Sequence, residues 1–211
     1  MNALSRMPRN RIHFATFRVQ MAEADTMGVY NVKDALGAPI TNVGHIAVRL
    51  NMFPRTQNYV RLFNTYKICK VKFEFIPVQT RARIDKDDVG IDSNIPTFTT
   101  LINRQSTSFP ANNNQAISVP YAKQTNAGKY HTHYFTPVTF DTVYRAAPAL
   151  TNALNPEYAQ YLQVEYADVN HHGVSWVMSQ AGSKWASNSF EYRVVATIYV
   201  AFKGIKVDVT A

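Results

Sequence analysis

Cysteine is nearly missing from this sequence, since Cys69 is the single one among 211 residues. One cysteine excludes an internal disulfide and a CxxC metal site, which fits a reducing compartment or a role indifferent to redox state. Long apolar runs are missing too, because no stretch approaches the roughly 18 residues of a membrane-spanning helix. The opening residues, MNALSRMPRN, lack the apolar stretch of a signal peptide. We therefore expect no insertion into a membrane.

Catalytic signatures are also lacking. The sequence contains no Gly-rich phosphate loop, no nucleophile elbow and no HExxH motif. The acidic stretch around Asp85, Asp87 and Gly90 begins like a calcium-binding loop, but Val89 and Pro96 occupy its fifth and twelfth places. This excludes an EF-hand, whose twelfth residue is a glutamate, and leaves a looser calcium site between subunits or a solvated acidic turn. We predict a protein that is not an enzyme and binds no cofactor.

Histidines provide the main candidates for a metal site. His131 and His133 are two residues apart on a predicted strand, so both point to one face. Two imidazoles bind zinc when a third ligand joins them, and Asp168, His171 and His172 would be the candidates. The alternative, which we favour, is that these histidines are hydrogen-bonded strand and loop residues. We predict no metal site.

The cysteine and the two tryptophans are assigned by their neighbours. Cys69 falls in the apolar set of its predicted strand and should pack as a small hydrophobe. Trp176 shares its face with Val174 and Met178, which favours a place in the core. Trp185 lies in the polar stretch SKWASN and is a candidate for contact with a partner.

Helical periodicity is nearly absent, and period-2 alternation takes its place. The clearest case is YRVVATIYVAF, whose β-branched and aromatic residues predict one long strand. Segments 79–94, 103–128 and 180–190 have loop compositions, and 146–157 has room for one helical turn. Eight strands without helices in about 200 residues favour a closed barrel or a two-sheet jelly roll. The eight predicted strands are 12–21, 45–52, 65–75, 95–102, 129–136, 158–166, 173–179 and 191–203.

The third predicted strand, TYKICKVKFEF, has lysines on one face and apolar residues on the other. One alternating set is Lys67, Cys69, Val71, Phe73 and Phe75, and the other is Tyr66, Ile68, Lys70, Lys72 and Glu74. We expect the first set to face the core. The second set would then hold Lys70 and Lys72 outward.

Positive charge is concentrated in the first two fifths of the chain. The net charge is +8, and residues 1–83 hold 13 basic against 4 acidic residues, whereas residues 84–211 hold 9 against 10. A one-sided basic balance favours a polyanionic partner, which is nucleic acid or a membrane surface. The alternative is a merely soluble basic protein.

Four segments resemble the capsid proteins of circoviruses and related small circular single-stranded DNA viruses. They are TYKICKVKFEFIP at 65–77, YHTHYFTP at 130–137, VNHHGVSWV at 169–177 and EYRVVATIYVAFKG at 191–204. Each is a weak motif alone, but their order and rough spacing agree with that family across residues 12–206. The resemblance implies a viral jelly roll of two four-stranded antiparallel sheets with long loops. With the eight strands lettered B to I along the chain, it implies the sheets BIDG and CHEF.

The resemblance also implies a function. Such proteins assemble as 60 copies into a T=1 icosahedral shell around circular single-stranded DNA, so the expected partners are other copies of the chain and DNA, with a host receptor or glycan outside. The expected location is the virion and the host cell. The chain departs from the family at its start, where only Arg6, Arg9 and Arg11 precede the first strand in place of a long arginine-rich arm. A shortened arm or another mode of packaging would explain this, and nuclear targeting is not implied.

This interpretation divides the chain into a short basic arm at 1–11, a jelly-roll domain at 12–206 and a tail at 207–211. In the implied sheet, strands B, D and I are neighbours, and their outward basic residues would share one face. Like charges so placed repel unless anions meet them. We expect DNA phosphates to do so, although a solvated face or ion pairs between subunits to Glu74, Asp85 or Asp168 are alternatives. The candidate DNA-facing residues are Arg6, Arg9, Arg11, Arg18, Lys70, Lys72 and Arg193.

Two other classes remain as alternatives. A cellular β-sandwich that binds nucleic acid or carbohydrate would share the strands and the charge. A cupin-type enzyme would need several histidines and a carboxylate around a metal, and His131 with His133 does not supply them.

Overall fold

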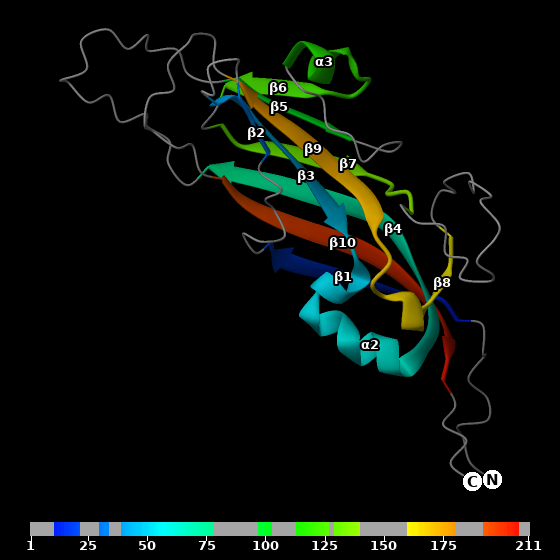
Figure 1. The fold of residues 1–211 in the computed structure, drawn as a ribbon. Helices are drawn as coiled ribbons and strands as arrows, with labels where there is room; N and C mark the ends of the chain where they lie inside the picture. The colour runs from blue at the N-terminus through cyan, green and yellow to red at the C-terminus, as the bar shows by residue number, and fades with distance from the viewer. Residues whose placement is uncertain are drawn as a thin grey trace, which may run out of the picture.

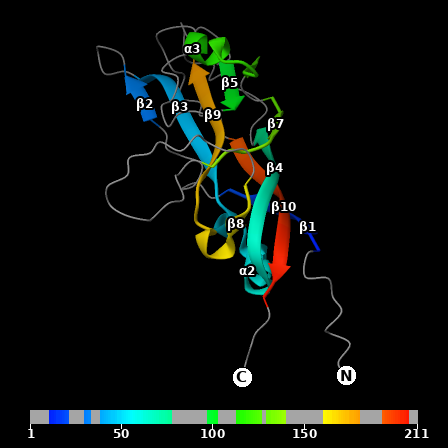
Figure 2. The same ribbon diagram turned by 90° about the vertical axis from the view of Figure 1, so that its right-hand side faces the viewer.

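Two antiparallel β-sheets form the body of the molecule, with a few short helices at their ends (Figure 1). Figure 2 shows the sheets as two layers, with β3, β9 and β5 on one side and β4, β10 and β1 on the other. Within the described residues, no helix is long and apolar enough to cross a membrane. The computed structural model describes residues 11–21, 30–33, 39–77, 97–102, 113–126, 129–139, 160–179 and 192–206.

The first sheet has the strand order β1-β10-β4-β7, and the short β8 pairs with the far end of β4. Its two long central strands are the segments in which alternation was clearest. The strands are β1 (His13–Gln20), β4 (Phe63–Pro77), β7 (His131–Phe135), β8 (Leu162–Gln163) and β10 (Tyr192–Ile205).

The second sheet has the order β2-β3-β9-β5-β6. At Gly173 in β9 a Cβ atom would lie 1.7 Å from the carbonyl oxygen of Ile46, so only glycine fits where β3 approaches this closely. The strands are β2 (Tyr30–Lys33), β3 (Pro39–Val48), β5 (Thr97–Ile102), β6 (Lys123–Asn126) and β9 (His171–Ser179).

This arrangement confirms the predicted all-β jelly roll of two packed antiparallel sheets. Each sheet has five strands rather than four, because β8 and β2 add to the predicted orders BIDG and CHEF. Two strands occupy other positions than expected. Segment 129–136, predicted as strand F, forms β7 beside β4 in the first sheet, where G was expected, and β6, within the predicted loop 103–128, takes the place of F beside β5.

The predicted strand at 158–166 is largely wrong. Of its described residues, 160–166, only Leu162 and Gln163 form a strand, and Val164–Tyr166 is a 3-10 helix, η4. The edge of β4 pairs with β7 from Val71 to Phe75, and its pairing with β8 is limited to Thr65 and Tyr66. Likewise the predicted strand 45–52 ends at Val48, where the pairing of β3 with β9 stops.

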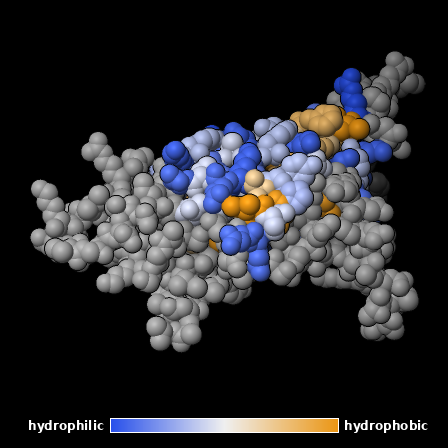
Figure 3. Space-filling model, turned by 90° about the horizontal axis from the view of Figure 1, so that it is seen from above, coloured by the Kyte–Doolittle hydropathy of each residue, from blue (hydrophilic) through white to orange (hydrophobic). Residues whose placement is uncertain are grey.

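Short helices follow β3 and cover one end of the core. The 3-10 helices η2 (Leu50–Met52) and η3 (Pro54–Thr56) lead into α2 (Gln57–Leu62), which alternation did not predict. Tyr59 of α2 stacks on Phe202 with ring centroids 5.0 Å apart, so α2 closes the inner face of the first sheet. A second unpredicted helix, α3 (Asn113–Ser118), precedes β6. Seen from above, the described surface is mostly hydrophilic around small apolar patches (Figure 3).

The core lies between the sheets, and a β-bulge in β4 decides which residues enter it. Lys70 lies opposite Tyr199 and Ile68 opposite Val200, so Cys69 is an extra residue in β4. The bulge keeps Ile68 in the core together with the apolar residues on its far side. The buried residues of β4 are Phe63, Tyr66, Ile68, Val71, Phe73 and Phe75.

The bulge also corrects two predictions from strict alternation. Tyr66 and Ile68, expected on the lysine face, are fully buried. Cys69, expected in the core, is half-buried and absent from the core cluster, because the extra residue shifts the alternation there. Trp176 is buried as predicted.

Candidate nucleic-acid interface

The outer face of the first sheet is the site that the charge pattern predicted. Four of the candidate residues lie on this face, opposite to the buried side chains of their strands. They are Arg18 in β1, Lys70 and Lys72 in β4, and Arg193 in β10. The register places Arg18 opposite Thr197, and Thr197 opposite Lys72, so Arg18 and Lys72 lie in one row across the sheet.

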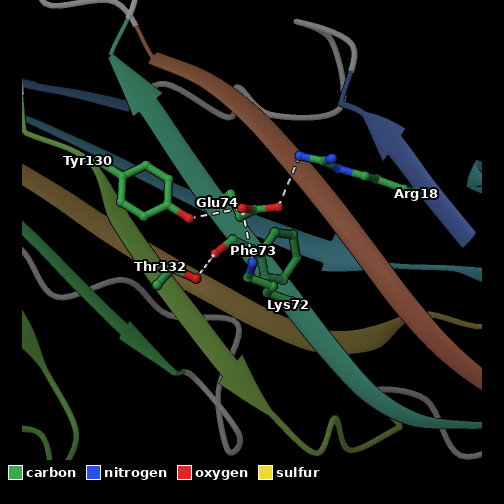
Figure 4. A network of polar contacts seen from close by, with 6 residues as sticks. All are labelled: Arg18, Lys72, Phe73, Glu74, Tyr130 and Thr132. Atoms are coloured by element: carbon green, nitrogen blue, oxygen red, sulfur yellow. Dashed lines mark hydrogen bonds and ion pairs between the residues drawn. The ribbon is translucent and has the colours of Figure 1, made fainter. Parts of the chain in front are cut away.

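A single carboxylate, Glu74, lies at the centre of one part of this face (Figure 4). Arg18 donates from Nη2 to Glu74 Oε2 at 3.2 Å, and Lys72 donates from Nζ to Oε1 at 3.0 Å. The hydroxyl of Tyr130 also donates to Oε1, at 2.9 Å. We call Arg18, Lys72, Glu74 and Tyr130 the Glu74 cluster. Two strands, β1 and β4, and the residue before β7 thus meet at one acid.

The cluster is electrostatically self-consistent. The hydrogen bonds from Lys72 and Tyr130 lower the pKa of Glu74, and the hydrogen bond to Glu74 raises the pKa of Lys72. Burial and the hydrogen bond to Glu74 raise the pKa of Tyr130. The Glu74 side chain is only 12 % exposed, whereas that of Arg18 is 61 % exposed. Part of the anion expected for this face is therefore a carboxylate of the same chain, not of a neighbouring subunit.

The rest of the outer face combines lysines with exposed tyrosines. Lys70 Nζ lies 5.7 Å from the ring centroid of Tyr134 and donates to Thr136 Oγ1 at 2.7 Å. Tyr199 meets Tyr134 edge-on, with centroids 5.8 Å apart. Near β8, the ammonium groups of Lys67 and Lys203 lie 5.7 and 5.9 Å from the ring centroid of Tyr161. We call Lys67, Lys70, Lys203, Tyr134, Tyr161 and Tyr199 the lysine–tyrosine half of the face.

The two parts differ in their charge balance. Within the described parts of the chain, Lys67, Lys70 and Lys203 make no ion pair, whereas both cations of the Glu74 cluster do. Lysine over a tyrosine ring gains a cation–π attraction but keeps its full charge. The positive charge of the lysine–tyrosine half therefore stays available to an external anion.

The remaining predicted residues are placed as follows. Arg11 is exposed just before β1, and Arg193 is exposed near the start of β10. Arg6 and Arg9 lie outside the described residues, as do Asp85, Trp185 and the segments 79–94 and 146–157. Two further lysines of this face were not among the predicted residues: Lys67, which strict alternation assigned to the core face, and Lys203, near the end of the long strand β10. Only the bulge at Cys69, which the sequence pattern does not mark, explains the orientation of Lys67.

His131 and His133 lie inside the core and form a hydrogen-bonded bridge between the sheets. Nε2 of His133 lies 2.5 Å from the hydroxyl oxygen of Thr100 in β5, and Nε2 of His131 also contacts that hydroxyl. One hydroxyl donates one hydrogen bond and accepts others, so it satisfies two neutral imidazoles in different tautomers. Burial lowers the pKa of His131 to about 4 and, with His131 nearby, the pKa of His133 to about 3.

This arrangement favours the structural interpretation of these histidines over a zinc site. Among the residues that the structure describes, no three His, Cys, Asp or Glu side chains are grouped so as to bind a metal ion. His171 and His172 are buried in β9, and burial also lowers the pKa of His171 to about 4. His171 Nδ1 lies 3.1 Å from the carbonyl oxygen of Val169 and donates to it.

Comparisons with known proteins agree with this fold. A family described as "Circovirus capsid protein" matches residues 3–206 of the chain. The crystal structure of the 60-mer BFDV capsid protein resembles it with a TM-score of 0.65 at 16 % identity, covering 97 % of this chain and 100 % of that one. The crystal structure of the decameric BFDV capsid protein gives a TM-score of 0.54 at 18 % identity, covering 92 % of this chain and 99 % of that one. The X-ray structure of Melon necrotic spot virus gives a TM-score of 0.51 at 11 % identity, covering 92 % of this chain and 56 % of that one. No curated protein sequence matches the chain.

Proposed function

The chain belongs to the circovirus capsid protein family, and we propose that 60 copies of it form a T=1 shell that encloses circular single-stranded DNA. Membership makes the chain a structural component of the virion rather than an enzyme. It also removes the alternatives of a cellular binding module and a cupin. The BFDV capsid proteins of similar fold form a 60-mer and a decamer, which supports assembly from a single kind of chain.

The observation that carries DNA enclosure is the charge on the outer face of the first sheet. The described part of this face has six cations and one carboxylate, Glu74; the cations are Arg18, Lys67, Lys70, Lys72, Arg193 and Lys203. Sixty copies of a chain of net charge +8 would carry roughly +480 in one shell. Such a shell is unstable to self-repulsion unless it encloses a polyanion, and phosphate contacts of this kind need no base sequence.

Charge reversal on β4 tests the enclosure of DNA. Lys70→Glu with Lys72→Glu should lower the nucleic acid packaged per particle, seen as a lower 260/280 nm absorbance ratio of purified particles. Arg55→Glu with Arg61→Glu changes the net charge equally, on exposed residues of η3 and α2, and should leave the ratio higher than in the β4 variant. Intact particles with an unchanged ratio in the β4 variant would rule out this face.

Assembly is tested separately, by size-exclusion chromatography and negative-stain microscopy of the purified chain. Closed particles of many subunits support the shell, whereas a stable monomer of 23.9 kDa would contradict it.

A further inference from the structure

We propose that the lysine–tyrosine half of the outer face binds single-stranded nucleic acid by base stacking on Tyr134 and Tyr161, with phosphates held by Lys67, Lys70 and Lys203. The inference rests on the proposed function, because it assumes that the enclosed polyanion reaches this face. It goes further by assigning part of the binding to the bases and by excluding the Glu74 cluster from the contact.

The two rings lie at the surface of the first sheet, unlike the aromatic residues of the core. Phe73, Phe75 and Phe98 are buried in the core, whereas Tyr134 is 57 % exposed and Tyr161 is 39 % exposed. Exposed aromatic rings beside positive charge are the pattern by which proteins bind single strands, because every base has a face to stack. A duplex keeps its bases stacked on each other and offers no such face.

Each ring has a cation where a stacked nucleotide needs one. The ammonium group of Lys70 lies over the Tyr134 ring, and those of Lys67 and Lys203 lie over the Tyr161 ring, all within 6 Å of the ring centroids. A base that stacks on a face covered in this way displaces the ammonium group, which is then close enough to bind the phosphate of the same nucleotide. Tyr199 contacts Tyr134 edge-on at 89°, which limits the ring to one orientation. A ring held in place loses little freedom on binding a base.

The spacing of the two rings fits one strand. Tyr134 pairs with Lys72, and Tyr161, just before β8, lies beside Lys67. Because Cys69 is an extra residue in β4, Lys67 and Lys72 are four ladder steps apart, opposite Ala201 and Thr197, which is about 13 Å at the usual rise of a strand. A few extended nucleotides would span both rings and pass Lys70 on the way.

The Glu74 cluster is a poor place for the same ligand. Its carboxylate repels phosphate, and it already binds Arg18 and Lys72. An acidic segment of a second copy of the chain is the competing occupant of the lysine–tyrosine half. Charge alone would suit it, but a carboxylate makes no use of exposed rings, so the tyrosines favour nucleic acid.

Binding of short oligonucleotides to the full chain tests the proposal. The probes are fluorescent oligothymidylate and an abasic oligonucleotide of equal length, which keeps the phosphates and lacks the bases. Tyr134→Leu removes the ring, Tyr134→Phe keeps it, and Tyr130→Leu is the matched control, since Tyr130 is similarly exposed at 52 % but belongs to the Glu74 cluster. Anisotropy titrations give Kd for each pair.

We expect Tyr134→Leu to weaken oligothymidylate binding at least about fivefold, the loss of one base stack. Tyr134→Phe and Tyr130→Leu should stay within about twofold, and the abasic probe should bind all three variants alike. Equal losses for both probes, or equal losses in Tyr134→Leu and Tyr130→Leu, would overturn base stacking. So would a Tyr134→Leu chain that binds oligothymidylate normally but fails to assemble, which would assign the face to a second copy. Particle formation by the unmutated chain is scored independently, so failure of the shell itself is seen separately.

Discussion

The two faces of β4 are built on opposite principles. The inner face is a continuous apolar surface, on which Val71, Phe73 and Phe75 are at most 1 % exposed. The alternate residues of the same strand, Lys70, Lys72 and Glu74, lie on the outer face. The inner side chains gain stability by leaving water, at about 1.5–3 kcal/mol for each large one. The outer side chains stabilise the fold little and instead set what the sheet attracts.

The largest expected effect comes from breaking the inner face. Phe73→Ala removes a ring that stacks on Phe135 and leaves a cavity between the sheets, so we expect a loss of about 3–5 kcal/mol in the free energy of unfolding. Thr16→Ala, at an exposed position of β1 on the outer face, should change it by less than about 0.5 kcal/mol. Urea denaturation of the subunit measures both. Similar losses in the two variants would contradict the division between faces.

A smaller effect comes from the histidines of the inner face. Burial holds the pKa of His133 at about 3, below its ordinary value of 6.5, so the folded chain binds fewer protons than the unfolded chain between these values. Stability is therefore complete above pH 6.5 and falls as the pH drops toward 3. By pH 5, His133 alone should reduce the free energy of unfolding by about 2 kcal/mol.

The variant His133→Gln isolates this term. It keeps a polar partner for Thr100 and has no charge to gain, so its loss of stability between pH 7 and pH 5 should be about 2 kcal/mol smaller than that of the unmutated chain. Other groups beside His133, His131 and Lys123, are unchanged in the comparison. If the two chains lost the same stability between pH 7 and pH 5, His133 would bind protons equally in the folded and the unfolded chain, and its lowered pKa would be contradicted.

The sequence pattern predicted most of the fold, because in a long alternating strand the burial of one face determines which residues point into the core. β1, β4, β5, β9 and β10 fall at or within two residues of the predicted bounds at most ends. The pattern failed where the pairing with a neighbouring strand, rather than the alternation of apolar residues, decides whether a segment becomes a strand. Residues 123–126 are polar and short, and they become β6 only because the edge of β5 is available. Residues 158–166 alternate, but β7 occupies the edge of β4 from Val71 to Phe75, and β8 pairs only with Thr65 and Tyr66.

The sequence predicted the basic residues of the candidate site, but not the division of the outer face into the Glu74 cluster and the lysine–tyrosine half. Arg18, Lys70 and Lys72 could be assigned to one face from alternation and the resemblance to circovirus capsids. Glu74 was in the outward set of its strand, but its bonds to Arg18 and Tyr130 join residues 56 positions apart in each direction. Such contacts depend on the register of three strands, which a single sequence does not specify.

The smallest and most discriminating effect compares Lys70 with Lys72 on the same face of β4. Each phosphate contact of single-stranded DNA adds about 0.7 to the slope of log K against log salt. Lys70→Gln should reduce the slope for oligothymidylate by about that amount, whereas Lys72→Gln should reduce it less, because Glu74 already compensates the charge of Lys72. In a Glu74→Gln background, Lys72→Gln should produce the full reduction. Titrations between 50 and 200 mM salt measure the slopes. Equal reductions for both lysines in the unmutated background would show that Glu74 does not divide the face, and the lysine–tyrosine half would lose its separate role.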